Sequence, residues 1–348
     1  MPEGGKNRRR YASERLSDRE SSSPARRALL ATAKALISAA LIYWLLRDTS
    51  LAEVATALRS ARPGLLVAAL AIYTLRYAVG AIRWRVMLGP AGTRASLPFL
   101  FRSNLVAVFF SNFLPSIIGG EAVRIYDTWR LGTTKGTAVA VIALDRFIGL
   151  AALVLFVLAG LGLSGGLVSA IAIAHLNWWL GLGSAAMLGV LWAVFKPPTS
   201  PRARALFRLP LLNRIADRLR EPAGIYRGRS GALLKALALS VLIQGIVILH
   251  YVVLGAALGL PVPPGAYFLI VPVAVFLMML PISINGIGIR ENAFVFFFGF
   301  YGVSRADAVA FAWLAYGVVV LLGLAGGTIL GFRREQRMRS DGGSRGGD

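Results

Sequence analysis

"FLPSIIGGEAVRIY", residues 113–126, interrupts a long apolar segment with a proline, two adjacent glycines and then charged side chains. A second stretch, "MLPISINGIGIRENAF" at residues 279–294, has the same order of features. Proline removes a backbone donor and glycine weakens a helix, so each stretch predicts a break between two half-helices. The predicted breaks contain Pro115, Gly119 and Gly120 in the first stretch and Pro281, Gly286 and Gly288 in the second.

The composition places these breaks in a membrane protein. Hydrophobic residues make up 56% of the chain and charged residues 16%, whereas soluble domains carry roughly 25% charged residues. A helix needs ~20 predominantly apolar residues to cross the hydrocarbon core. We therefore predict an all-α polytopic membrane protein with six full spans, at residues 28–46, 65–82, 137–161, 177–195, 236–258 and 305–331.

The net charge of +22 indicates topology rather than nucleic-acid binding. Lys and Arg are spread over tails and connectors instead of forming one basic domain, so nucleic acid is not an expected partner. The positive-inside rule places the tail 1–27, the basic amphipathic connector 196–235 and the tail 332–348 in the cytoplasm. Connectors 162–176 and 259–266 contain no Lys or Arg and are predicted to lie outside. We expect both termini to be cytoplasmic and both tails to be disordered.

Two further apolar segments, 97–117 and 267–300, contain the breaks and can be either full spans or re-entrant hairpins. As full spans they would move the basic connector 196–235 to the outside, against the positive-inside rule. As hairpins they keep it in the cytoplasm. We therefore predict two re-entrant helical hairpins within two inverted-topology repeats, 28–161 and 177–331. In transporters of this architecture the substrate binds where the broken helices meet.

Several charged residues fall inside or beside the predicted membrane segments. An ionisable side chain at the bilayer centre costs roughly 2.5–3.5 kcal/mol on insertion scales, so each is a candidate functional residue. Arginine holds phosphate through charge-assisted hydrogen bonds, and a carboxylate can neutralise it when the site is empty or carry a coupling proton. The predicted substrate-binding residues are Glu121, Arg124, Asp145, Arg146, Arg290 and Glu291.

A structural role is the alternative for the charged residues, because ion pairs can hold the hairpins against neighbouring helices. This alternative applies most strongly to Arg76, Asp127 and Arg130. Gln244 and His250 are expected to tie helices together, as polar residues within membrane spans often do.

Motifs of enzyme chemistry are missing from the sequence. It contains no Cys, no H-E-x-x-H zinc pattern, no Walker loop for phosphate and no G-x-S-x-G nucleophile elbow. We therefore expect no catalytic residue, no metal site and no cofactor, and the chain is not predicted to be an enzyme.

Three motifs together resemble those of a known family. They are NFLPSIIGGEAVR at 112–124, LDRFIGL at 144–150 and LPISINGIGIRE at 280–291. They are similar to the motifs of the flippase-like membrane proteins named after the transmembrane region of lysylphosphatidylglycerol synthase. The resemblance covers roughly residues 30–331. Glu121 stands where that family often has Asp, which preserves the charge.

The resemblance implies a protein of the plasma membrane that moves a lipid, or a lipid-linked headgroup, between leaflets. The expected partners are anionic membrane lipids, whose phosphate Arg124 and Arg290 would bind. The alternatives are a membrane-embedded transferase with Glu121 or Asp145 as base, and a non-transporting partner of a lipid-modifying enzyme. Large family members carry an added cytosolic transferase domain. We expect this chain to be a stand-alone member without that domain, unable to synthesise an aminoacyl lipid.

Overall fold

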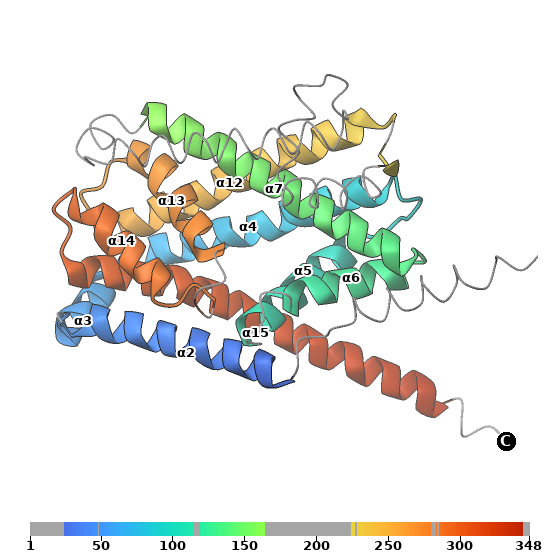
Figure 1. Cartoon of the computed structure of the whole chain (residues 1–348), viewed down its shortest axis with the longest axis horizontal. Helices are drawn as coiled ribbons and strands as arrows, with labels where there is room; N and C mark the ends of the chain where they lie inside the picture. Colours follow the sequence, from blue (N-terminus) through green and yellow to red (C-terminus); the bar gives the residue numbers. More distant parts are fainter. Residues whose placement is uncertain are drawn as a thin grey trace, which may run out of the picture.

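The computed structural model describes residues 24–343 apart from residues 48, 114–118, 164–223, 227, 280–282 and 284. Every element in this described part of the chain is an α-helix, as the sequence predicts. The helices pack into one bundle (Figure 1). They are α2 (Pro24–Leu46), α3 (Leu51–Ser60), α4 (Pro63–Leu88), α5 (Leu97–Phe113), α6 (Gly119–Arg130), α7 (Lys135–Leu163), α12 (Ser230–Ala257), α13 (Pro264–Met279), α14 (Ile289–Gly299) and α15 (Arg305–Gly343).

Four of these helices are long and apolar enough to cross a membrane, counting only the described residues. They are α4, α7, α12 and α15, which coincide with the spans predicted at 65–82, 137–161, 236–258 and 305–331. The helix α2 covers the span predicted at 28–46, and its segment Leu36–Leu46 is apolar. The chain is therefore a polytopic helical membrane protein.

Other predicted segments fall largely outside the described residues. They are the span 177–195, the exterior connector 162–176, most of the connector 196–235 and most of the tail 1–27. The C-terminal segment differs from the prediction, because α15 continues to Gly343 although a disordered tail is predicted from residue 332. Arg, Glu, Gln and Met follow Phe332, and these good helix formers allow the helix to extend past its apolar part.

Both predicted helix breaks are present. The first separates α5 from α6, which begins with Gly119 and Gly120, and the two helices contact each other. The second separates α13 from α14, and both Gly286 and Gly288 adopt positive φ there, at 73° and 84°. Such angles favour glycine because it has no Cβ. Pro115 and Pro281 themselves lie outside the described residues.

The two broken helices approach the centre of the bundle from opposite ends. In Figure 1, α5 and α6 lie towards one end of the bundle, and α13 and α14 lie towards the other. From the first pair, α5 packs against α15, and from the second pair, α13 packs against α7. Glycine makes both crossings close, since a Cβ on Gly326 would overlap the backbone of Leu105, and one on Gly160 would overlap the backbone of Phe268 and Leu269.

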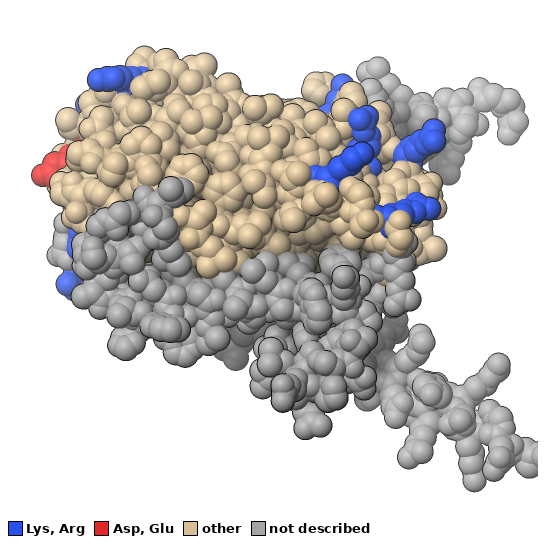
Figure 2. Space-filling model, turned by 90° about the horizontal axis from the view of Figure 1, so that it is seen from above, with Lys and Arg blue, Asp and Glu red and all other residues tan. Residues whose placement is uncertain are grey.

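More of the basic side chains in Figure 2 lie at one end of the bundle than at the other. This is the end at which α4 and α6 finish and α7 and α12 begin (Figure 1). Tyr226, just before α12, fixes this region by donating a hydrogen bond to the carbonyl oxygen of Met87 at 2.7 Å. Burial raises the pKa of the Tyr226 phenol, so it stays protonated as a donor. Exposed basic residues of these segments are Arg85, Arg94, Arg102, Arg130, Lys135 and Lys235.

Candidate functional site

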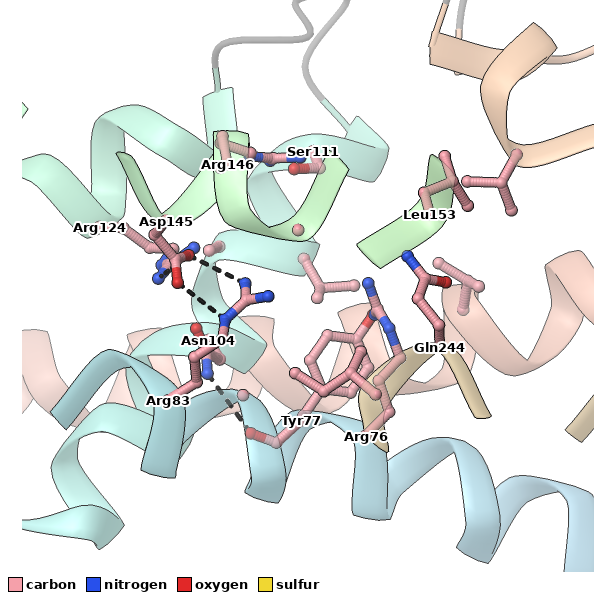
Figure 3. A pocket seen from close by; sticks show the side chains of 18 of the residues that line it. Arg76, Tyr77, Arg83, Asn104, Ser111, Arg124, Asp145, Arg146, Leu153 and Gln244 are labelled. Atoms are coloured by element: carbon pink, nitrogen blue, oxygen red, sulfur yellow. Dashed lines mark hydrogen bonds and ion pairs between the residues drawn. The ribbon is translucent and has the colours of Figure 1, made fainter. Parts of the chain in front are cut away.

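A cavity of about 370 Å³ lies inside the bundle, where both halves of the chain meet. The first broken helix contributes Asn112 and Gly120 to its wall, and the second contributes Met279, the last residue of α13. The cavity wall is strongly basic for a membrane protein interior (Figure 3). Its charged residues are Arg76, Arg83, Arg124, Asp145 and Arg146.

Asp145 organises one side of the cavity. Its carboxylate is fully buried and forms an ion pair with Arg83, with Nε 2.8 Å from Oδ1. It also accepts hydrogen bonds at Oδ2 from Nη2 of Arg83 at 3.0 Å and from Nη2 of Arg124 at 2.9 Å (Figure 3). We call these three residues the Asp145 triad. One carboxylate shared by two guanidinium groups leaves this triad with one excess positive charge.

The fold holds the triad from four helices. Arg83 of α4 donates from Nη1 to Ser240 of α12 at 2.7 Å, while Asp145 lies on α7 and Arg124 on α6. The Arg124 guanidinium lies 4.6 Å from the ring centroid of Trp84, which is fully buried. Stacking on an aromatic face suits a planar guanidinium and orients it. The first broken helix is therefore tied to α4 and α7 through Arg124, and Ser240 connects Arg83 of the triad to α12.

A second ion pair lies beside the triad. Nε of Arg146 is 2.7 Å from Oε1 of Glu121, so the guanidinium that lines the cavity is paired with the first turn of α6. The Arg146 side chain is 52% exposed and that of Glu121 is 28% exposed. Exposed pairs contribute little to stability because solvent screens them. This pair is therefore better placed to respond to a ligand than to stabilise the fold.

Arg290 and Glu291, which the sequence predicts as substrate-binding residues, lie at the second break and contact its backbone. Neither is among the residues that line the cavity. Glu291 accepts a hydrogen bond from the backbone N–H of Gly288 at 2.7 Å, and Arg290 donates to the carbonyl oxygen of Asn285 at 3.1 Å. Arg290 also stacks on Tyr316, 4.4 Å from its ring centroid. Both side chains thus satisfy backbone groups that the second break exposes, which is the structural alternative.

The two breaks contact each other directly. The side-chain amide of Asn285 donates a hydrogen bond to the carbonyl oxygen of Asn112 at 3.0 Å. The side chain of Asn112 in turn donates to the carbonyl oxygen of Val319 on α15 at 3.1 Å. A direct hydrogen bond therefore joins the two broken helices.

A comparison with protein families identifies the family of the chain. The family model described as "Lysylphosphatidylglycerol synthase TM region" matches residues 31–327, which include both breaks and the Asp145 triad. The chain belongs to this family. The resemblance drawn from the three sequence motifs is thereby confirmed. No match was found among curated proteins.

The predicted site residues of this lysylphosphatidylglycerol synthase transmembrane-region protein do not include every residue that lines the cavity. Arg83 is not among the predicted site residues, the structural alternative was considered for Arg76, and Gln244 was expected to tie helices together. The useful signal was the spacing of Arg76 and Arg83, which lie about two helical turns apart and therefore on one face of α4. The structure brings Arg124, Asp145 and Arg146 to the same cavity, with Glu121 paired to Arg146.

Proposed function

We propose that the protein is an integral membrane lipid translocase that moves an anionic phospholipid, or an anionic lipid-linked headgroup, between leaflets. The observation that carries the proposal is the cavity lined by four arginines and a single aspartate, within a bundle of apolar helices. Uncompensated positive charge is costly in such surroundings and is relieved by an anion. Phosphate oxygens match the donors of arginine in number and geometry.

The packing of the helices supports two inverted repeats, at 28–161 and 177–331. In the two repeats, α5 corresponds to α13, and α7 corresponds to α15. The contact between α5 and α15 then has its counterpart in the contact between α13 and α7. Glycines at both crossings, Gly160 and Gly326, are about 166 residues apart, and so are Gly120 and Gly286 at the two breaks. Inverted repeats allow one half to rock against the other around a central site, which is how alternating access arises.

The charge distribution supports an orientation in the plasma membrane. The positive-inside rule places the basic end of the bundle in the cytoplasm, together with both termini. The hairpin of α5 and α6 then enters from the cytoplasmic side, and the hairpin of α13 and α14 enters from the exterior. Non-helical backbone at these breaks is tolerated because it is buried in protein or lines a cavity.

The Asp145 triad suggests how a headgroup would enter and leave. In the empty protein Asp145 neutralises part of the charge on Arg83 and Arg124. A phosphate group that enters the cavity would share these donors with Asp145, while the acyl chains stay in the bilayer. Sharing keeps binding weak enough for release into the other leaflet, as transport requires.

The test is a purified-protein assay in liposomes. A fluorescent anionic phospholipid is placed in both leaflets, and a membrane-impermeant quencher reports the lipid that reaches the outer leaflet. The proposal expects faster quenching than in protein-free liposomes, no change in lipid mass, and loss of the acceleration in Arg124→Ala. Arg102→Ala, an exposed arginine on α5, is the matched control. Unaccelerated movement with wild-type protein contradicts translocation, and a changed lipid mass supports the transferase alternative instead.

A further inference from the structure

Arg76 differs from the other arginines of the cavity. Arg83 and Arg124 share Asp145, and Arg146 pairs with Glu121. Among the residues that the structure describes, no ion pair joins Arg76 to a carboxylate, whereas each of the other three arginines has one. Arg76 is therefore the cavity arginine whose charge the described residues leave unneutralised.

The surroundings of Arg76 hold it without cancelling its charge. Its guanidinium carbon lies 5.2 Å from the ring centroid of Tyr73 and 4.7 Å from that of Tyr77, one turn apart on α4. Aromatic faces attract and orient a guanidinium but contribute no net negative charge. Figure 3 shows Arg76 between the ring of Tyr77 and the amide of Gln244, and both of these residues also line the cavity. A cation that is fixed in place but not paired is suited to bind an anion.

The charges around the cavity do not balance. Four arginines line it, and two carboxylates, Asp145 and Glu121, pair with three of them. Two positive charges remain, one on Arg76 and one on the Asp145 triad. Arg76 and the triad's Arg83 lie about two turns apart on one face of α4. A ligand that balances both must carry two negative charges and accept hydrogen bonds from two directions.

We propose that Arg76, Tyr73, Tyr77 and Gln244 form an anion subsite opposite the Asp145 triad, and that the headgroup is a terminal phosphate monoester. This inference rests on the proposed translocase function and names its substrate class. A phosphate monoester carries nearly two negative charges at neutral pH and presents three free oxygens, so one group matches the two excess charges. A phosphodiester carries one charge and has two free oxygens, and a zwitterionic headgroup carries no net charge.

Binding to the full chain in phosphatidylcholine nanodiscs tests the inference without requiring transport. Calorimetry would compare short-chain phosphatidic acid, a monoester, with short-chain phosphatidylglycerol, a diester, against empty nanodiscs. The expected ratio of affinities at pH 8 is about tenfold or more in favour of phosphatidic acid. One additional charge-assisted hydrogen bond contributes a difference of this size. Equal affinity for the two lipids overturns the inference, and this comparison needs no variant.

Variants locate the preference at Arg76. Arg76→Gln is expected to weaken phosphatidic acid binding about tenfold and to leave phosphatidylglycerol binding within about twofold. Arg76→Lys, which retains the charge, should keep most of the preference. Arg85→Gln, an exposed arginine of the same helix, is the matched control and should behave as wild type. An equal loss for both lipids in Arg76→Gln would show that Arg76 acts only on the structure, and would overturn the subsite.

The pH dependence gives a separate readout. The second pKa of a phosphate monoester is about 6, whereas arginine stays charged throughout this range. Lowering the pH from 8 to 5 converts the dianion to a monoanion, so the preference of the wild type for phosphatidic acid should disappear. In Arg76→Gln the ratio should change little with pH. A wild-type ratio that does not depend on pH contradicts recognition of a dianion.

Two further measurements show which part of the proposal is wrong if a prediction fails. Competition with inorganic phosphate tests whether the ligand is a soluble anion. If inorganic phosphate competes for the site as well as phosphatidic acid does, the conclusion that the ligand is a lipid is wrong. Transport is measured independently with fluorescent lipids in proteoliposomes. Monoester-selective binding without movement contradicts the proposed translocase function alone. Movement of anionic lipids without monoester-selective binding contradicts this inference alone.

Discussion

Asn285 donates a hydrogen bond from its side-chain amide to the backbone carbonyl oxygen of Asn112 at 3.0 Å, and so joins the two helix breaks of the protein. These residues are distant in sequence, and each lies where a broken helix ends or restarts. Asn285 also adopts a positive φ of 53°, which asparagine tolerates better than most residues. One side chain thus shapes the second break and connects it to the first.

Substitutions at Asn285 separate these two roles. Asn285→Gly keeps the positive φ but removes the hydrogen bond, so the expected loss of stability is about 0.5–1.5 kcal/mol. Asn285→Ala removes the bond and adds roughly 1–2 kcal/mol of left-handed backbone strain. Thermal unfolding in detergent should therefore rank wild type above Gly and Gly above Ala. If Asn285→Ala is as stable as Asn285→Gly, residue 285 does not adopt the strained positive φ at the break.

Removal of the Asp145 carboxylate tests the charge balance of the cavity. Asp145→Asn leaves Arg83 and Arg124 without a counter-charge, and breaking a buried pair in this way costs about 3–5 kcal/mol. An anionic lipid that neutralises the arginines should restore much of the melting temperature, because it binds the folded state. The measurement is thermal unfolding with phosphatidic acid and with phosphatidylcholine.

Asp127→Asn is the control for this experiment. Asp127 is also buried and accepts a hydrogen bond from Ser103 at 2.5 Å, but it does not line the cavity. Its substitution should lower the melting temperature without specific rescue by anionic lipid. Equal rescue of both variants would indicate a general lipid effect and would contradict anion binding at the Asp145 triad.

The helix crossing at Gly326 should control transport. A Cβ at this position would overlap the backbone of Leu105, so Gly326→Ala should force α15 away from α5 and slow lipid movement. Gly317→Ala on the same helix meets nothing within 4 Å and should leave transport unchanged. Normal transport rates in Gly326→Ala would argue against this crossing as a part of the moving machinery.

Two single cysteines can establish the topology, because the natural chain contains none. Ser96→Cys is exposed just before α5, and Pro261→Cys is exposed between α12 and α13. A membrane-impermeant maleimide added to intact cells should label Pro261→Cys and should label Ser96→Cys only after lysis. Labelling of both in intact cells would contradict hairpins that enter from opposite sides.

The parts of the fold that follow from local sequence were predictable. Pro and Gly mark the breaks, and the apolar length marks α4, α7, α12 and α15. The site was less predictable, because helix ends depend on packing. The span predicted at 65–82 continues to Leu88, since Trp84, Met87 and Leu88 are buried, and this extension carries Arg83 into the cavity wall.

The similarity of the two motifs does not predict every contact at the two breaks. It suggested equal roles for Arg124 and Arg290, and both stack on an aromatic ring. However, the second break uses Arg290 and Glu291 to satisfy its own backbone, a local need that a motif comparison does not reveal. The carboxylate that engages Arg124 comes from α7, through tertiary structure.

The most direct test of the central claim is the rate at which fluorescent lipids cross the bilayer of liposomes that contain the wild-type protein. The cavity carries excess positive charge, so the account predicts that anionic phosphatidic acid or phosphatidylglycerol crosses faster than in protein-free liposomes, whereas phosphatidylcholine does not. If phosphatidylcholine crosses as fast as the anionic lipids, or if no lipid is accelerated, then the cavity does not carry anionic headgroups between leaflets.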